Sequence, residues 1–87
     1  MLTTPLAQAA TIRILPGETV GGDWNVHEHS DQWCFVLAGR GRITVGGEVQ
    51  ELSPGDLLVI EKGEWHELVC LDDEPFDTLN FYAPPEF

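Results

Sequence analysis

Three histidines are the residues of this chain whose type and spacing could support chemistry. His27 and His29 lie two residues apart, and His66 follows much later in the chain. Residues two apart in a β-strand project from the same face, so a strand through the pair would point both imidazoles one way. Three neutral imidazoles that converge from two strands would satisfy a divalent transition metal. The pattern therefore predicts a metal site, with surface histidines beside acids by chance as the alternative.

The composition limits the partners that such a site could serve. The chain has 87 residues with 15 acidic and 4 basic side chains, a formal net charge of -11 at pH 7. Nucleic acid and anionic membranes both need a basic surface, so neither is expected as a partner. The start of the chain lacks the basic region of a secretory signal, and its two cysteines suggest no disulfide framework. These features predict a cytoplasmic protein.

Short strands separated by glycine and proline turns must position the histidines. Gly46 and Gly47 predict a two-residue hairpin, because both can adopt positive φ. Many short strands with closely spaced turns are typical of an all-β sandwich or closed barrel. Residues 1–10 are expected to be an N-terminal arm or an edge strand that crosses to a partner, ahead of one barrel domain over residues 11–87. The expected strands cover residues 11–15, 26–29, 33–38, 42–45, 48–52, 57–60, 65–71 and 78–82.

The first histidine segment resembles a motif of the small single-domain cupins. That motif has Gly, five residues, His-x-His, a Glu after three or four residues, and Gly after six more. Here Gly21 precedes His27 and His29 at the family spacing. Gln32 stands where the family has Glu, after a gap of only two residues, and Gly39 follows it at the family distance.

The second histidine segment resembles the other cupin motif, which has Gly, five residues, Pro-x-Gly, two residues, His, three residues and Asn. Gly55, Gly63 and His66 match this pattern. Glu61 replaces the motif Pro, and Cys70 replaces the motif Asn. The match in spacing implies that the fold is the cupin double-stranded β-helix, also called a jelly-roll barrel.

The resemblance also implies a set of metal ligands. His27, His29 and His66 match the three imidazole ligands of the family, and Gln32 takes the fourth position. Asp31 is the alternative, because in an unbroken strand it would share the face of the two earlier histidines. The metal would be Fe, Mn, Ni, Zn or Cu, and a neutral fourth ligand would leave room for water or an anionic substrate.

Two classes of function follow from the resemblance, which covers about residues 12–83. The first is a metal-dependent enzyme on a small polar substrate, with a dioxygenase favoured over an isomerase. The second is a non-catalytic cupin module that binds or senses a metal or a small ligand. Retention of the metal by purified protein would distinguish them.

The strand expected over residues 33–38 also has a second face, formed by the residues that alternate with the expected ligand Gln32. Trp33, Phe35 and Leu37 alternate with Gln32 and Cys34, so they form either the second layer of the sandwich or a subunit interface. A chain of this length buries only about 60–65% of its unfolded surface. Cupins are commonly dimers, so the resemblance implies a homodimer.

Other reactive side chains lie near the expected ligands. Cys34 and Cys70 share a face with them by alternation, so they either line the cavity or pack as small hydrophobic residues, which is the favoured interpretation. Glu28, Glu64 and Glu67 are the nearby acid or base candidates, and their parity predicts that they face solvent.

Overall fold

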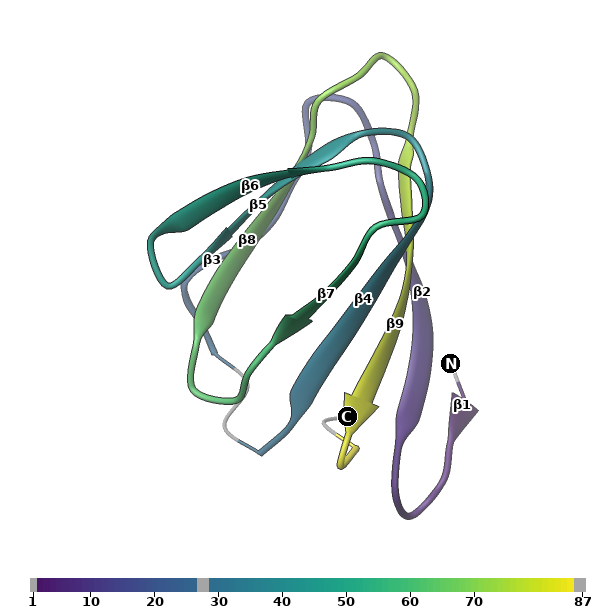
Figure 1. Cartoon of the computed structure of the whole chain (residues 1–87), viewed down its shortest axis with the longest axis vertical. Helices are drawn as coiled ribbons and strands as arrows, with labels where there is room; N and C mark the ends of the chain where they lie inside the picture. Colours follow the sequence, from purple (N-terminus) through teal and green to yellow (C-terminus); the bar gives the residue numbers. More distant parts are fainter. Residues whose placement is uncertain (1, 27–28, 86–87) are drawn as a thin grey trace.

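Two antiparallel sheets face each other in this protein (Figure 1). The computed structural model describes residues 2–26 and 29–85, and these residues form strands and turns without a helix, so none of them belongs to a helix that could cross a membrane. The five-stranded sheet has the spatial order β1 (Leu2–Thr3), β2 (Gln8–Ile14), β9 (Phe76–Ala83), β4 (Asp31–Ala38) and β7 (Leu57–Ile60). The four-stranded sheet has the order β3 (Thr19–Val26), β8 (Trp65–Cys70), β5 (Gly41–Val45) and β6 (Glu48–Leu52). The predicted all-β jelly-roll architecture is confirmed.

The hairpin between β5 and β6 forms as predicted. Val45 pairs with Glu48, and the two residues between them are Gly46 at φ 54° and Gly47 at φ 94°. Positive φ at both central positions is the requirement of a two-residue turn whose twist matches the flanking strands.

The strand expected over residues 26–29 has different bounds in the part of the chain that the structure describes, and residues 27 and 28 lie outside that part. β3 instead covers Thr19–Val26, and His29 lies at a bend before β4. The prediction failed because Gly21 and Gly22 suggested a break, whereas the strand continues through both. Gly21 adopts a φ of 91°, and the register against β8 shifts between Gly22 and Val26, as at a β-bulge.

Two strands that begin in the N-terminal segment, within residues 2–10, pair with the chain's own sheet. β2 begins at Gln8, within the segment expected as an arm, and runs along β9. β1 folds back so that Leu2 pairs with Ala9. The Thr4 hydroxyl closes the turn between these strands by accepting hydrogen bonds from the backbone N–H groups of Leu6 and Ala7 at 3.3 and 3.1 Å.

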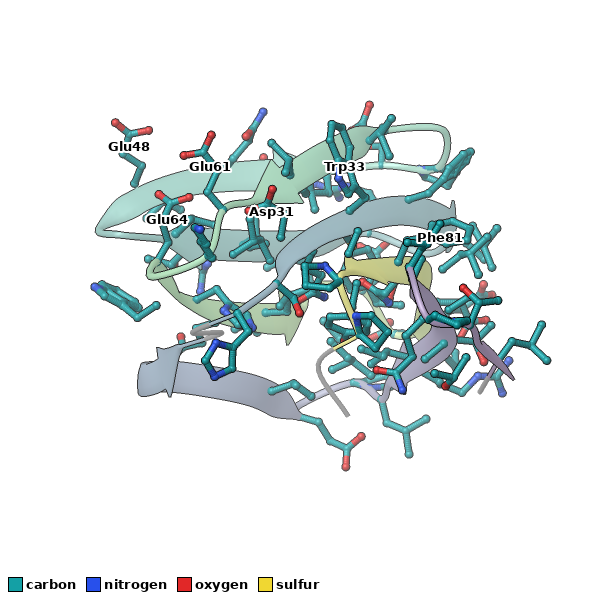
Figure 2. The ribbon with its side chains drawn as sticks, turned by 90° about the horizontal axis from the view of Figure 1, so that it is seen from below. Asp31, Trp33, Glu48, Glu61, Glu64 and Phe81 are labelled. Carbon is teal, nitrogen blue, oxygen red and sulfur yellow. The ribbon has the colours of Figure 1, made fainter. Side chains whose placement is uncertain are left out.

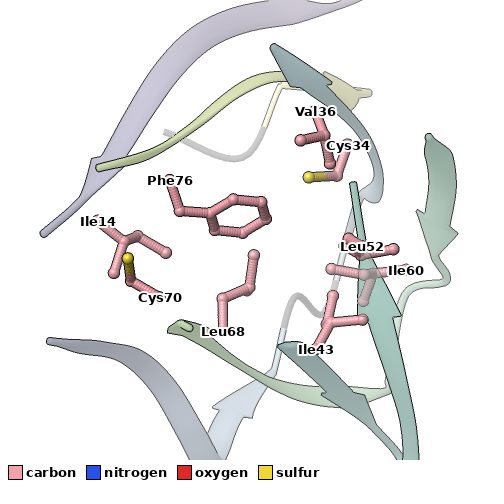
Figure 3. Packing of buried hydrophobic residues seen from close by; sticks show 9 residues of the cluster. All are labelled: Ile14, Cys34, Val36, Ile43, Leu52, Ile60, Leu68, Cys70 and Phe76. Carbon is pink, nitrogen blue, oxygen red and sulfur yellow. The ribbon is translucent and has the colours of Figure 1, made fainter. Parts of the chain in front are cut away.

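The hydrophobic core lies between the two sheets and contains both cysteines. Figure 3 shows Cys34 beside Val36 on one side of the cluster and Cys70 beside Ile14 on the other, with Phe76 between them. Both thiols are free and buried. Both cysteines therefore pack in the core as small hydrophobic residues, which is the interpretation favoured from the sequence. The cluster comprises Ile14, Cys34, Val36, Ile43, Leu52, Ile60, Leu68, Cys70 and Phe76.

The two central strands of the five-stranded sheet carry an unusual pattern. A half-buried strand normally turns its apolar side chains inward and its polar ones outward. In β9, the polar residues Thr78 and Asn80 are fully buried, while the large apolar residue Phe81 is exposed. In β4, Gln32 is buried while Trp33 is exposed. At these positions the inner face of the sheet presents polar groups and the outer face large apolar ones, while Cys34, Val36 and Phe76 are apolar residues of the same inner face.

Candidate functional site

The expected ligands within the described residues lie at one end of the sandwich. Gln32 is the second residue of β4, and His66 is the second residue of β8. Both strands begin at the lower end of the molecule in Figure 1, where His29 lies in the connection from β3 to β4. The fold therefore brings His66 to the same end as His29 and Gln32, although it lies far from them in sequence.

Gln32 and His66 both belong to inner faces. Gln32 is 2% exposed and His66 is 4% exposed. His66 lies opposite Val45 of β5, which is also partly buried against the core. Gln32 lies opposite Ile60 of β7, which is a core residue. Since directly paired residues of antiparallel strands project to the same side, the imidazole and the amide both face the interior.

The amide of Gln32 is held by a chain of buried side chains. Its Nε2 donates to Oδ1 of Asn80 at 2.9 Å, and Nδ2 of Asn80 donates to the Thr78 hydroxyl at 2.9 Å. That hydroxyl donates to the backbone carbonyl of Ile12 at 3.2 Å. With Nε2 engaged by Asn80, the amide has one defined orientation, and its Oε1 is the atom that could bind a metal.

The histidine pair of the first motif is only partly described. His27 lies outside the described residues, as does Glu28. His29 is exposed, and the neighbouring Ser30 is fully buried and donates from its hydroxyl to the Pro84 carbonyl, which ties this segment to the end of β9. Within residues 2–26 and 29–85, no three His, Cys, Asp or Glu side chains are grouped so that they could hold a metal ion.

Asp31, the alternative fourth ligand, occupies a different environment from Gln32. It alternates with Gln32 along β4, so it starts the row of outward residues that continues at Trp33. Its Oδ1 accepts a hydrogen bond from the backbone N–H of Lys62 at 3.0 Å. This bond joins the start of β4 to the turn between β7 and β8.

A pocket of about 520 Å³ opens between the β5–β6 hairpin and β7, beside this end of the sandwich. Ile43, Val45 and Leu58 form apolar parts of its wall, and Val45 is the cross-strand partner of His66. The polar lining comes from Glu48, Gln50 and Glu64, and Figure 2 shows the two glutamates beside Glu61 at this end.

Glu64 departs from its expected position. Alternation along the strand predicted that it faces solvent, but it is half-buried and lines the pocket. Its Oε1 accepts a hydrogen bond from the backbone N–H of Glu61 at 2.9 Å, which closes the turn before β8. The prediction failed because Glu64 lies in that turn, where the two-residue period of a strand does not apply.

The thiol of Cys34 lies deeper than the ligands, on the inner face of β4. Burial raises the pKa of Cys34 to about 11, and a hydrogen bond with the Thr78 side chain opposes part of that rise. The thiol is therefore protonated at neutral pH, a state in which sulfur is a poor nucleophile.

Sequence reasoning missed the polar chain and the pocket wall. Thr78 and Asn80 lie in the strand expected over residues 78–82 and Gln50 in the strand expected over residues 48–52, and the sequence gives none of them a role in the site. A signal was present in β9, where polar residues alternate with Leu79 and Phe81. That alternation alone could not say which set faces inward.

Comparisons with known proteins agree with this architecture. The family described as a cupin domain matches residues 10–82. The crystal structure of BH2720 from Bacillus halodurans has a TM-score of 0.91 and 27% identity, over 98% of this chain and 67% of that chain. KdgF from Halomonas sp. has a TM-score of 0.87 and 27% identity, over 97% of this chain and 74% of that chain.

A curated relative shares the sequence pattern over part of its length. The uncharacterized protein YrkC of Bacillus subtilis (strain 168) is 27% identical over an alignment of 75 residues, and the alignment covers 79% of this chain and 39% of that relative. This chain thus spans about two fifths of the length of YrkC. Since the family match covers most of the chain and the two-sheet architecture agrees with it, this protein belongs to the cupin domain family.

Proposed function

We propose that this protein is a metal-binding cupin that holds a divalent transition metal through His27, His29, His66 and Gln32. The observation that carries the proposal is the pair of buried polar side chains, Gln32 and His66, on the inner faces of opposite sheets at one end of the fold. Neutral imidazole nitrogen suits Fe, Ni, Zn and Cu alike, so the donor set does not select one of these four.

The orientation of Gln32 supports its role as the fourth ligand. An amide can bind a metal only through its oxygen, and Asn80 engages the nitrogen of this amide at 2.9 Å. Partners of this kind orient metal ligands in many sites. Asp31 is the weaker candidate, because its carboxylate already accepts a hydrogen bond from Lys62 on the outward side of β4.

The pocket beside His66 supports a small polar substrate. A bound divalent ion would polarise an oxygen atom of that substrate. The pocket wall has two carboxylates, Glu48 and Glu64, and no Lys or Arg among its described lining residues. Neutral or cationic molecules are therefore favoured over anions at this opening. An oxygenase is our first choice of enzyme class, and an isomerase is the second.

A non-catalytic module is the second candidate function. Gln32 occupies the position of a carboxylate ligand, and a neutral amide binds metal more weakly than a carboxylate. Such a site could bind or sense a metal without turning over a substrate. Oxygen uptake across a panel of small diketones, phenolics and thiols tests the oxygenase, since neither a binding module nor an isomerase consumes oxygen with any metal bound.

The first experiment is elemental analysis of protein purified without a metal-affinity tag. We expect about one transition metal per chain, and we expect His66→Ala to lose it. Glu67→Ala is the matched control, because Glu67 is the next residue of β8 and points to the opposite face. Circular dichroism checks that both variants keep the β-sheet structure.

Two results would contradict the proposal. Wild-type protein that stays metal-free after incubation with each of the five metals would exclude the site. If His66→Ala retained the metal and Glu67→Ala lost it, the metal site would lie in a different part of the molecule.

A further inference from the structure

The pocket between the β5–β6 hairpin and β7 has an apolar floor and a polar rim. Ile43, Val45 and Leu58 pack against the core and form the floor. Glu48 and Gln50 of β6 are the cross-strand partners of Val45 and Ile43, so their side chains lie on the same side of the sheet as the floor. A volume of about 520 Å³ is within the range of about 300–1,000 Å³ for small-molecule sites. The pocket is therefore suited to a small molecule that is partly apolar and partly polar.

The carboxylate of Glu64 is held at the rim by one of its two oxygens. Oε1 accepts the hydrogen bond from the backbone N–H of Glu61 at 2.9 Å. Oε2 lies on the side of the hairpin, where a Cβ built on Gly46 would be 3.6 Å from it. The hairpin is itself joined to the start of β8, because the backbone N–H of Gly46 donates to the Trp65 carbonyl at 3.0 Å. The second oxygen of Glu64 is thus fixed on the pocket wall, across from Glu48 on the other side of the hairpin turn.

No basic side chain belongs to the wall of this pocket in the described part of the chain. The chain has four basic residues, of which Arg13 and Arg40 form ion pairs with aspartates elsewhere. Arg42 alternates with the buried Ile43 along β5, so it points to the outer side of the four-stranded sheet. Lys62 lies in the turn before β8 and is not among the pocket residues. The two carboxylates of the rim therefore give the pocket an uncompensated negative charge, which a cationic ligand would balance.

The apolar floor connects this negative rim with the proposed metal site. Val45 is the cross-strand partner of His66, and the Cβ atoms of such a pair are about 5 Å apart. A molecule that extends from the metal to the rim would lie along the floor. It would need an oxygen donor at the metal end, an apolar body, and a positive charge at the rim.

We propose that the substrate of this site is a small organic cation, in which an alkyl or aryl body carries an ammonium group that Glu48 and Glu64 bind. The inference rests on the proposed function, because it names the substrate class of the same site. Hydrogen bonds from an ammonium group to carboxylates are charge-assisted, and the amide oxygen of Gln50 can accept a further N–H. An inorganic cation would gain nothing from the apolar floor, which is why an organic one is favoured.

Calorimetric titration at pH 7 of the Zn²⁺-loaded wild-type protein tests the proposal with three phenols. Tyramine, tyrosol and 3-(4-hydroxyphenyl)propionate differ only in the group at the end of a two-carbon chain, which is an ammonium, a hydroxyl or a carboxylate. We expect tyramine to bind about tenfold or more tightly than tyrosol, as expected for hydrogen bonds to charged groups. The propionate should bind most weakly, because its charge has the same sign as the rim.

Glu64→Gln removes the charge and keeps an oxygen that can accept the bond from Glu61. We expect it to weaken tyramine binding about tenfold and to leave tyrosol binding within about twofold. Glu67→Gln is the matched control, because it makes the same change of charge on the opposite face of β8. Glu48→Lys, at an exposed position of β6, should reverse the order, so that the propionate binds more tightly than tyramine. Circular dichroism checks the fold of each variant.

Three results would overturn the proposal. The first is the absence of tyramine binding at millimolar concentration, and the second is equal affinity for the three phenols. The third is an equal loss of tyramine affinity in Glu64→Gln and Glu67→Gln, which would show a general attraction to a chain of net charge -11.

The same titrations on metal-free protein and on His66→Ala separate this proposal from the proposed metal site. If the wild-type chain binds no metal but still prefers tyramine, the metal-binding function fails and the selection for cations stands. If the chain binds metal but does not discriminate among the phenols, the metal site stands and the selection for cations is overturned.

Discussion

At the scale of single residues, the buried amide of Gln32 is the feature on which the proposed site depends. A buried polar group must find a partner, or its desolvation destabilises the fold. Here Asn80 and Thr78 continue the hydrogen-bonded chain across the inner face of β9. The same bonds that satisfy the interior of the sheet therefore also direct the oxygen of Gln32. Asn80 is in this sense a positioning residue, which acts through Gln32.

Asn80→Ala tests that role. Loss of the bond to Nε2 removes a partner that orients the amide, so metal affinity is expected to fall about 10- to 100-fold. Calorimetric titration with Zn²⁺ measures the affinity, and thermal unfolding of the metal-free protein measures the structural cost. Thr78→Val is the control, because it removes a buried hydroxyl one step further from Gln32. Equal affinities in Asn80→Ala and wild-type protein, with a lower stability, would assign Asn80 a structural role only.

At the scale of elements, the connection from β4 to β5 controls how the two sheets meet. Gly41 begins β5 and faces the ring of Phe76, which begins β9 and is fully buried. A Cβ at position 41 would lie 2.3 Å from Cε2 of that ring. The absence of a side chain at Gly41 therefore lets the four-stranded sheet pack against the aromatic centre of the core.

Gly41→Ala is expected to destabilise the fold by about 1–3 kcal/mol, because the ring has no space to move in a packed core. Urea unfolding followed by tryptophan fluorescence measures this loss. The double variant Gly41→Ala with Phe76→Leu is the control, since a smaller side chain at position 76 relieves the clash. The two effects should therefore be less than additive. Full additivity would show that the glycine matters for another reason.

At the scale of the whole molecule, charge opposes folding and association alike. An excess of 11 negative charges on 87 residues produces repulsion that increases as the chain becomes compact. The ion pairs Arg13–Asp77 and Arg40–Asp72 are both at the surface, where such pairs contribute little. The hydrophobic core therefore stabilises the fold against a long-range repulsion that salt can screen.

Added sodium chloride should accordingly raise the melting temperature at pH 7. A stabilisation of about 1 kcal/mol corresponds to a rise of about 4–8 °C for a domain of this size. The effect should disappear near pH 4.2, the isoelectric point of the sequence, because little net charge remains to be screened. Differential scanning fluorimetry at both pH values measures it. A salt effect of equal size at both would point to hydrophobic salting-out instead.

Local patterns in the chain were sufficient to predict most of the architecture. The glycine pair 46–47 specified its hairpin, because the backbone conformation of a two-residue turn depends on those residues alone. The runs 33–38, 48–52 and 57–60 corresponded to strands, since alternation and turn residues are local signals. The expected start of a strand at residue 26 was wrong, because the irregularity after Gly22 that lets β3 begin at Thr19 depends on the pairing of β3 with β8.

By itself, the sequence determined the all-β class, the turns and the identity of the residues that could bind a metal. It did not determine which set of alternate residues in β4 and β9 faces inward. Polar and apolar residues alternate in both strands, and either set could form the core. Only the tertiary structure decided this, by placing Gln32, Thr78 and Asn80 where they satisfy one another's hydrogen bonds. The physical reason is that a buried polar side chain is stable only beside a partner, and its partners come from strands that are distant in sequence.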